Sequence, residues 1–484
     1  MIDFIKQEFW IILLFVNYLL ATSAAFTILL KNINPTKTVS YIIVLIFFPF
    51  LGILVYYLFG QEYRKNKIFN RKNILNQNII KSIQSDLELN KREVKQVDNY
   101  LDGKVKLIKL LYNSENSPLT ICNDIDVFKE GKTKFARLIQ DIESAKHHVH
   151  LEYYIIKDDT IGTQLLNAIC RKAKEGIEVC VTYDDVGSKI SSTMKKKLDD
   201  CGVHHYPFMP IVFTKFTGKM NYRNHRKIAV IDGVIGYVGG INIGDEYINN
   251  ESTQHFWRDT HIRIIGEAVK SLQIYFFTTW DFVSNKKFKI NKAYFPETPC
   301  KNSVGLQIAA SGPDTDWANI MEAIFTAITT ADDYVYITTP YFVPNEEITT
   351  ALCVAAKSGV DIRLIIPKNS DSKIVKNATN SYLEILLQAG VKVYKYKKGF
   401  IHAKTMVVDD IFSTVGTSNM DNRSFNINFE VNAFIYDKAN SKKLKQHFLE
   451  DLDECDRVKI EEYINRPKYK KLIESLSRLW SPLI

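Results

Sequence analysis

Two histidine–lysine pairs carry the clearest chemical signal in the sequence. One lies in NYRNHRKIAVIDGVIGYVGGIN at 221–242 and the other in HAKTMVVDDIFSTVGTSN at 402–419. Both follow the pattern H-x-K-x4-D with a later glycine and asparagine, and 402 − 225 and 419 − 242 both give 177. The matching residues are His225, Lys227, Asp232, Gly239 and Asn242, and then His402, Lys404, Asp409, Gly416 and Asn419. A pattern repeated at one fixed offset indicates a duplicated structural unit.

The segments that follow the histidines predict how these side chains point. IAVID and TMVVD are short β-branched runs, typical of a strand buried on both faces. Residues i and i+2 of a strand share a face, so the histidine and lysine of each copy point the same way. The aspartates have the opposite parity, which favours structural support behind the strand. If the copies pack about a pseudo-twofold axis, both pairs converge on one pocket together with Asn242 and Asn419.

Such a pocket suits an anionic phosphodiester. Lysine and amide groups would hold the non-bridging oxygens, one histidine would attack phosphorus, and the other would protonate the leaving oxygen. The alternative is two buried strands that happen to begin near histidine and lysine. It is disfavoured because burying a lysine without an anion is unfavourable.

With these motifs in view, the sequence resembles the phospholipase D superfamily, and within it the bacterial cardiolipin synthases. The resemblance rests on the paired motifs and on the stretches WRDTHIRIIG, GFIHAKTMVVDD and RLWSPLI, and it covers essentially the whole chain. It implies an α/β fold with two pseudo-symmetric phospholipase D-like halves that share one active site, preceded by two transmembrane helices.

The resemblance also implies a reaction. One histidine, with His225 the first choice, would form a phosphatidyl-histidine from phosphatidylglycerol while the other protonates the departing glycerol. A second phosphatidylglycerol would then attack to give cardiolipin. The implied catalytic residues are His225, Lys227, Asp232, His402, Lys404 and Asp409, with Asn242 and Asn419 binding substrate. No cofactor or metal is expected, because the lysines supply the positive charge.

Two acidic residues, Asp259 in WRD and Glu430 in NFE, receive a supporting role from the same resemblance. A carboxylate bonded to one imidazole nitrogen would fix the tautomer of a catalytic histidine. The alternative is a surface or capping carboxylate, because the spacings from the two histidines differ.

The duplication extends upstream of the motifs. TKFARLIQDIESAK, HHVHLEYYII, GTQLLNAICRKAKEG and IEVCVTYDDV predict the order helix, strand, helix, strand, and IMEAIFTAITTAD, YVYITTPYFV, EITTALCVAAKSG and VDIRLIIP repeat it. We therefore expect one half over 106–300 and another over 301–484. Gly176 and Gly359 lie where a helix should end.

The N-terminal region predicts a membrane anchor. Residues 9–30 and 39–60 carry no charged side chain, and each exceeds the roughly 20 residues that a helix needs to cross a bilayer. We expect a transmembrane hairpin over 1–60; a cleaved signal peptide is the alternative for the first segment. Basic residues follow at 64–72, within an expected basic, helical linker over 61–105. Their excess places the catalytic part in the cytoplasm of a multi-pass inner or plasma membrane protein.

Composition narrows the partners. The net charge of +9 favours an anionic partner, either acidic lipid or nucleic acid. Two apolar spans and only modest charge favour phosphatidylglycerol and anionic membrane lipid, and no nucleic acid is expected.

Seven scattered cysteines predict free thiols in a reducing compartment. His147, His148 and His150 resemble a metal cluster, but strand alternation separates their faces and no acidic residue lies at ligand spacing. Glu152 and Tyr154 would either line the pocket or pack.

Other functions remain open at this point. A phospholipase D-type hydrolase would use the same site with water as acceptor, and another phosphatidyltransferase would use a different alcohol. A membrane-anchored nuclease of the superfamily is a further alternative. A non-enzymatic scaffold would have no reason to keep both complete histidine–lysine pairs.

Overall fold

The computed structural model describes residues 2–30, 35–48, 50–53, 81–85, 87, 105–209, 222–249, 256–284, 289–298, 300, 302–313, 315 and 317–481. The chain divides into two compact units, Met1–Tyr63 and Arg64–Pro482. The basic stretch at 64–72 and nearly all of the expected linker helix lie outside the described residues.

The N-terminal unit contains α1 (Ile2–Leu30) and α2 (Pro35–Phe47), which meet through Ala21, Ile28 and Leu45. Among the described residues, one membrane-length apolar helix is present, Ile11–Leu30. Helix α2 ends just before Phe48, and its apolar stretch is shorter. Pro49 follows in the sequence, and a proline disfavours helical conformation in the residue before it. Two transmembrane helices are therefore not confirmed: the structure supports one candidate span, and residues 54–60 lie outside the described part.

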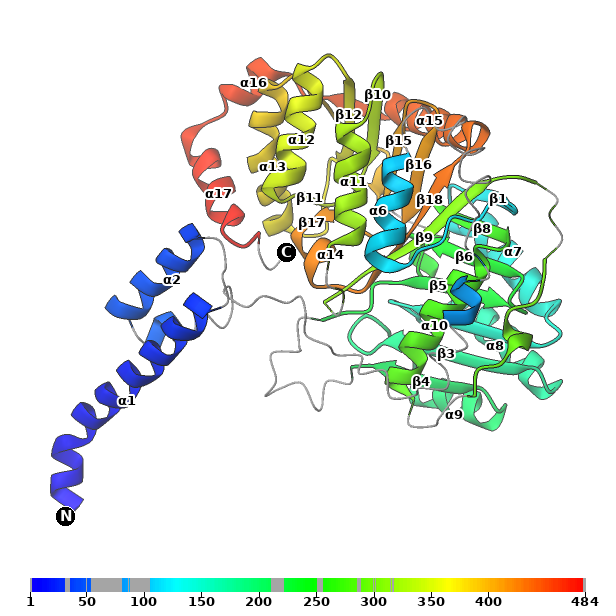
Figure 1. Cartoon of the computed structure of the whole chain (residues 1–484), viewed down its shortest axis with the longest axis horizontal. Coiled ribbons are helices and arrows are strands. Elements are labelled where there is room, and N and C mark those ends of the chain that lie inside the picture. The colour runs from blue at the N-terminus through cyan, green and yellow to red at the C-terminus, as the bar shows by residue number, and fades with distance from the viewer. Residues whose placement is uncertain are drawn as a thin grey trace. The chain divides into compact units, whose positions relative to one another are not determined.

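The first half is built on a seven-stranded mixed sheet (Figure 1). Its strands are β1 (Asn123–Phe128), β2 (His148–Tyr153), β3 (Glu178–Asp184), β4 (His204–Phe208), β5 (Lys227–Ile231), β6 (Ile235–Gly239) and β8 (His261–Gly266). They lie in the order β1-β8-β6-β5-β2-β3-β4, with β2, β3 and β4 parallel. The helices are α7 (Gly131–Glu143), α8 (Thr160–Lys174), α9 (Ser192–Asp200) and α10 (Val269–Val283).

The second half repeats this plan. Its strands are β9 (Gly305–Ser311), β10 (Tyr334–Thr338), β12 (Asp361–Pro367), β13 (Lys392–Tyr396), β15 (Thr405–Val408), β16 (Phe412–Gly416), β18 (Glu430–Tyr436) and β19 (Cys455–Arg457). The order β9-β18-β16-β15-β10-β12-β13 matches the first sheet strand for strand, and β19 extends it beside β13. The helices are α11 (Asn319–Thr329), α12 (Glu346–Lys357), α13 (Lys373–Gln388) and α15 (Lys438–Asp453). The predicted duplication is confirmed as two mixed α/β sheets.

Shorter elements connect the halves and follow the second one. They are α6 (Val105–Glu115), the 3-10 turns Asp245–Tyr247 and Lys292–Tyr294, β7 (Phe256–Arg258), β11 (Phe342–Val343), β14 (Gly399–Ile401), β17 (Met420–Asp421), α14 (Asn422–Asn426), α16 (Ile460–Ile464) and α17 (Lys468–Arg478). Although α6 precedes the first sheet, its Leu107 and Leu111 belong to the core of the second half.

A shared apolar layer joins the two halves. Val230 and Ile264 from the first sheet belong to one buried cluster with Val407 and Val431 from the second. Separate clusters lie under α7 and α8 in the first half and under α11, α12 and α13 in the second. Each sheet therefore has one face under its own helices and part of the other face directed toward its sister half. Burial of this layer fixes how the two H-x-K strands meet.

Local sequence signals explain where the helices begin and end. Asp159 and Asn345 accept backbone N–H bonds at the starts of α8 and α12, from Gly162 and Ile348. Gly176 (φ 86°) and Gly359 (φ 101°) follow the ends of these helices in the left-handed region, as the sequence predicts.

One expectation about the cysteines is wrong. Cys122 and Cys300 form a disulfide with a Cα–Cα distance of 4.9 Å, whereas Cys170, Cys180, Cys201, Cys353 and Cys455 are free. The pair was not visible in the sequence because 178 residues separate its members. They meet because the segment before β9 runs beside β1, where Val304 donates its N–H to the Asn123 carbonyl.

Candidate active site

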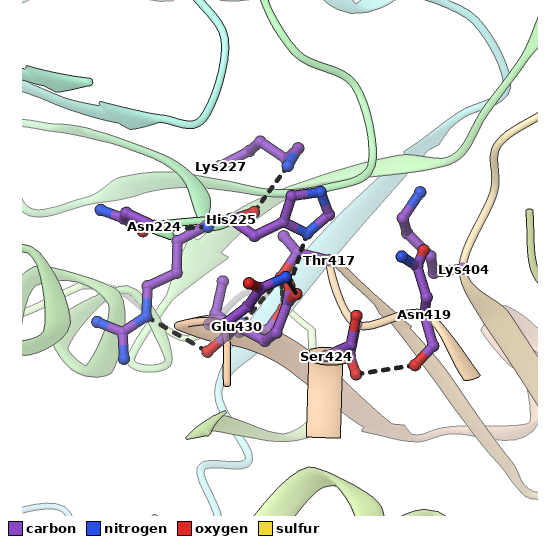
Figure 2. A network of polar contacts seen from close by, with 12 residues as sticks. Asn224, His225, Lys227, Lys404, Thr417, Asn419, Ser424 and Glu430 are labelled. Atoms are coloured by element: carbon purple, nitrogen blue, oxygen red, sulfur yellow. Dashed lines mark hydrogen bonds and ion pairs between the residues drawn. The ribbon is translucent and has the colours of Figure 1, made fainter. Parts of the chain in front are cut away.

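The two motif histidines are each held by a carboxylate from the opposite half. His225 Nδ1 lies 2.9 Å from Glu430 Oε2, and His402 Nδ1 lies 2.7 Å from Asp259 Oδ2. Figure 2 shows the first of these contacts, with the Glu430 side chain reaching the imidazole of His225. The expected supporting roles of Asp259 and Glu430 therefore have a geometric basis. The crossing between halves was not predicted.

Backbone bonds make the same crossing. The His225 N–H donates to the Phe429 carbonyl (2.9 Å), and the His402 N–H donates to the Arg258 carbonyl (2.7 Å). Strand β14, just before His402, pairs with β7 of the first half. Each histidine is thus positioned by main chain of the half that also supplies its carboxylate, so the site exists only where the halves meet.

The two motif lysines are buried beside the histidines. Lys227 Nζ donates to the His225 carbonyl (2.7 Å), and Lys404 Nζ donates to the His402 carbonyl (2.6 Å). Figure 2 shows Lys227 and Lys404 on opposite sides of the same space. Burial lowers the pKa of Lys227 to about 7 and that of Lys404 to about 8, despite the nearby Glu430 and Asp259 carboxylates. Because burial disfavours the charged form of both lysines, a bound anion would stabilise that form.

The histidines are also tuned by burial. Their side chains are 12% and 9% exposed, and burial lowers the pKa of both His225 and His402 to about 4. The facing carboxylate opposes that shift in each case. With Nδ1–H donated to a carboxylate, the neutral ring presents the lone pair of Nε2. Either histidine can therefore act as a nucleophile or as a base through Nε2.

The two carboxylates have equivalent electrostatic surroundings but different neighbouring residues. Burial alone would raise the pKa of Asp259 and of Glu430, but the neighbouring histidine and lysine hold both below their ordinary values. A Cβ at Gly240 would lie 2.0 Å from Asp259 Oδ1, so glycine makes room for that carboxylate. The equivalent position of the second copy is Thr417, whose hydroxyl donates to Glu430.

The motif asparagines have unequal surroundings. Asn242 Oδ1 accepts from the Ile155 N–H (3.2 Å), and its Nδ2 donates to the Tyr247 hydroxyl (3.0 Å), so this amide is bound into the framework. Asn419 lies beside Lys404 in Figure 2, and its buried Oδ1 has no hydrogen-bond partner among the described residues. The paired substrate-binding role stays a prediction: a phosphate oxygen would need the Nδ2 donor of Asn419, because the unpartnered Oδ1 is itself an acceptor.

The motif aspartates lie away from this pocket. Asp232 accepts the backbone N–H groups of Lys146, His147 and His148 at 2.8–3.1 Å. Asp409 does the same for Asp332, Asp333 and Tyr334 at 2.8–2.9 Å. Each sits in a left-handed turn after its strand, five residues and roughly 16 Å beyond the lysine. These contacts support the structural role that the parity argument favours, and a catalytic role for the two aspartates stays a prediction.

Two aromatic residues flank the histidines. The Tyr154 ring lies edge-on to His225 with centroids 5.0 Å apart, and the Trp257 ring lies 5.2 Å from that of His402. The sequence offers Tyr154 as a residue that lines the pocket or packs, whereas it does not single out Trp257. Its position two residues before Asp259 was the available signal, but nothing in the sequence separates such an aromatic residue from a core one.

His148 and His150 of β2 lie in a separate buried cluster with Gln273 of α10. His148 and His150 share hydrogen bonds with the Gln273 amide, and His150 Nε2 lies 3.2 Å from Glu178 Oε1. The ligand atoms of His150, Glu178 and Cys180 lie within 4.8 Å of one another, so an acidic partner at ligand spacing does exist, on β3. Adjacent parallel strands bring it there, which sequence spacing could not show. Glu152 packs inside, accepting from Asn224 (2.8 Å) and Thr279 (3.0 Å).

A pair of fused halves with crossed histidine–carboxylate contacts defines a protein of the phospholipase D-like class. Residues 138–281 and 324–452 match the family model described as "Cardiolipin synthase, PLD-like domain", and residues 9–61 match "Phospholipase_D-nuclease N-terminal". The chain belongs to the cardiolipin synthase family of phospholipase D-like proteins.

Relatives over nearly the full length support this assignment. The chain is 41% identical to the major cardiolipin synthase ClsA of Bacillus subtilis (strain 168), covering 97% of each chain. It is 40% identical to a cardiolipin synthase of Alkalihalophilus pseudofirmus, covering 94% of this chain and 91% of the relative. The crystal structure of phosphatidylserine synthase from Haemophilus influenzae superposes with a TM-score of 0.58 at 15% identity, covering 78% of this chain and all of that one. That likeness concerns the fold.

Proposed function

We propose that this protein transfers a phosphatidyl group from one phosphatidylglycerol molecule to another, giving cardiolipin and free glycerol. The observation that carries the proposal is the set of two crossed imidazole–carboxylate pairs with two buried lysines around one site. A phosphodiester matches this set because it needs a nucleophile, an acid and positive charge for its two non-bridging oxygens. The family relatives named cardiolipin synthase support the choice of lipid.

In the first half-reaction His225 Nε2 attacks the phosphorus of phosphatidylglycerol. A phosphorus–nitrogen bond forms and the bond from phosphorus to the glycerol oxygen breaks. His402 in its imidazolium form donates the Nε2 proton to that oxygen, and Asp259 stabilises the imidazolium. Burial disfavours this charge in the empty site, and a bound phosphate anion favours it.

The second half-reaction reverses these roles. His402, now neutral, accepts a proton from a hydroxyl of the second phosphatidylglycerol, whose oxygen attacks phosphorus and releases His225. Lys227 and Lys404, together with the Asn419 amide, hold the non-bridging oxygens throughout. Water must be kept from the intermediate, and the low exposure of both histidines and the flanking rings of Tyr154 and Trp257 favour transfer over hydrolysis.

The same proposal includes a membrane setting. The Ile11–Leu30 helix would anchor residues 1–60 in the inner or plasma membrane, and the two halves at 106–300 and 301–484 would work at its cytoplasmic surface. This places the site beside its anionic lipid substrate.

The test is to incubate the purified protein with phosphatidylglycerol in detergent micelles that contain a chelator. We expect cardiolipin and an equal amount of glycerol, and we expect His402→Ala to abolish both without changing the melting temperature by more than a few degrees. Phosphatidic acid as the main product would make the protein a hydrolase. Retained cardiolipin formation in the His402 variant would contradict the shared site.

A further inference from the structure

Helix α17 (Lys468–Arg478) carries an apolar stripe that continues past its end. The stripe consists of Tyr469, Leu472, Ile473, Leu476, Leu479 and Trp480. These positions follow the i, i+3, i+4, i+7 spacing of one helix face. The opposite face is polar and includes Lys470, Lys471, Glu474 and Arg478. By sequence alone, the apolar face would be expected to pack on the protein.

The structure shows the reverse orientation. Leu472 is 61% exposed and Leu479 is 69% exposed, and Ile473, Leu476 and Tyr469 are also exposed. In contrast, Glu474 on the opposite face is buried. The helix therefore directs its apolar stripe outward, which a water-facing surface does not favour.

Ionic and aromatic contacts hold the polar face against the second half. Arg466 Nε donates to Glu474 Oε2 (2.8 Å), and Arg466 also contacts Glu384 of α13. Lys471 Nζ lies 3.4 Å from Glu384, and the Arg478 guanidinium lies 4.5 Å from the centre of the Tyr382 ring on α13. Because several separate contacts fix this orientation, the outward stripe is a built feature of the fold.

The charge pattern identifies the surface that would cover the stripe. Lys468 and Lys470 are exposed on either side of it. An apolar helix face bordered by lysines, with a tryptophan at its end, is the signature of a helix lying in the interface of an anionic bilayer. A protein partner would need acidic groups around its apolar contact, whereas an anionic lipid surface supplies both features at once.

We infer that α17 is a membrane-surface helix, with its Leu472–Leu476–Leu479 stripe in the acyl boundary of an anionic bilayer and its lysines at the lipid phosphates. This second lipid contact uses none of the residues of the histidine site. It would orient the catalytic unit on the membrane independently of the N-terminal helix.

The test places a photo-crosslinking residue on the full-length protein. Leu476→p-benzoylphenylalanine carries the probe on the stripe, and Lys132→p-benzoylphenylalanine, at an exposed position of α7 in the first half, is the matched control outside α17. Both are reconstituted in phosphatidylcholine vesicles with and without phosphatidylglycerol, illuminated, and analysed for lipid adducts. We expect several-fold more lipid adduct at position 476 than at 132, and more with phosphatidylglycerol present.

Other outcomes would overturn the inference. Equal lipid adducts at the two positions, or adducts mainly to a second copy or to the N-terminal helix of the same chain, would show that something other than lipid covers the stripe. Repeating the experiment with His402→Ala separates this inference from the proposed reaction, because crosslinking needs no turnover. Leu472→Glu with Leu476→Glu should leave the melting temperature in detergent unchanged and weaken lipid quenching of tryptophan fluorescence in vesicles; unchanged quenching would contradict the inference.

Discussion

At the residue level, the exchange of carboxylates between the halves governs the chemistry. His225 depends on Glu430 and His402 depends on Asp259, each at hydrogen-bond distance. A histidine that loses its carboxylate can present the wrong tautomer and loses support for its imidazolium form.

Glu430→Gln and Asp259→Asn should each lower kcat by a factor on the order of 10³–10⁴, because the amide leaves shape intact but removes the charge. Cardiolipin formation at saturating phosphatidylglycerol measures the effect, with the melting temperature as the control for folding. Activity within a few-fold of the parent protein would show that these carboxylates do not act on the histidines.

The buried lysines are expected to lower the free energy of unfolding near neutral pH, although the reaction needs their charge. In the folded, empty site the pKa of Lys227 is about 7, against an ordinary value of 10.5. The unfolded chain therefore binds more protons between these pH values, so the free energy of unfolding rises with pH across this window. At pH 7 and below, burial of the charged lysine lowers the free energy of unfolding by its full amount.

Lys227→Met should accordingly abolish turnover and raise the melting temperature of the lipid-free protein at pH 7, by roughly 2–4 °C for each kcal/mol gained. The gain should disappear above about pH 10.5. Lys132→Met, on the exposed face of α7, serves as the control and should change neither quantity. A lower melting temperature for Lys227→Met would show that its hydrogen bond to the His225 carbonyl outweighs the cost of burial.

The pH dependence of kcat/KM follows from the same groups. Phosphate binding needs cationic lysines, so kcat/KM should fall as pH rises through 7 to 8, where Lys227 and Lys404 lose their protons. It should also fall below about pH 4, where the attacking imidazole of His225 becomes protonated, and the profile should already slope downward above pH 4, because His402 of the empty site is then neutral and must gain the proton that it donates. Lys404→Arg should move the alkaline decline to higher pH, and an unmoved decline would assign it to another group.

At the level of the elements, the motif aspartates hold β2 and β10 against the turns that follow β5 and β15. Each carboxylate accepts three backbone N–H groups at the start of the neighbouring strand. The conspicuous third letter of the motif is therefore a folding device that aligns the H-x-K strand with its neighbour.

Asp232→Ala should lower the free energy of unfolding by about 1–3 kcal/mol, because three backbone donors lose a charged acceptor, although water can reach the donors of Lys146 and His147. Chemical denaturation measures this loss, and kcat in the folded fraction should stay within about tenfold of the parent. Asp232→Asn, whose amide oxygen still accepts, should be milder. A kcat as low as that of His402→Ala would restore a catalytic role to Asp232.

For the molecule as a whole, the sequence predicted what lies in periodic or repeated local patterns. The constant offset revealed two halves, and residue parity separated Lys227 from Asp232 correctly. It could not predict that β7 pairs with β14, that Glu430 reaches His225, or that Cys122 meets Cys300. These contacts join residues that are far apart along the chain, and their geometry depends on how two complete sheets pack.

The disulfide allows a test at this level. It ties the segment before β1 to the segment before β9, so Cys122→Ser with Cys300→Ser should reduce the free energy of unfolding by about 2–4 kcal/mol without changing kcat. Cys455→Ser, which removes a free thiol, is the control and should have a small effect. Unchanged stability in the double variant would show that the bridge does not form in the protein as isolated.

The crossed carboxylates have a consequence for ancestry. A single half with the geometry of either copy would lack a partner for its own histidine, yet two identical halves would complete each other. The present chain is in this sense a fused dimer. Within one chain the two sides need not be identical, and the pairs Gly240 with Asp259 and Thr417 with Glu430 meet one requirement in two different ways. It follows that two chains, each damaged in a different half, could recover one working site by exchanging halves.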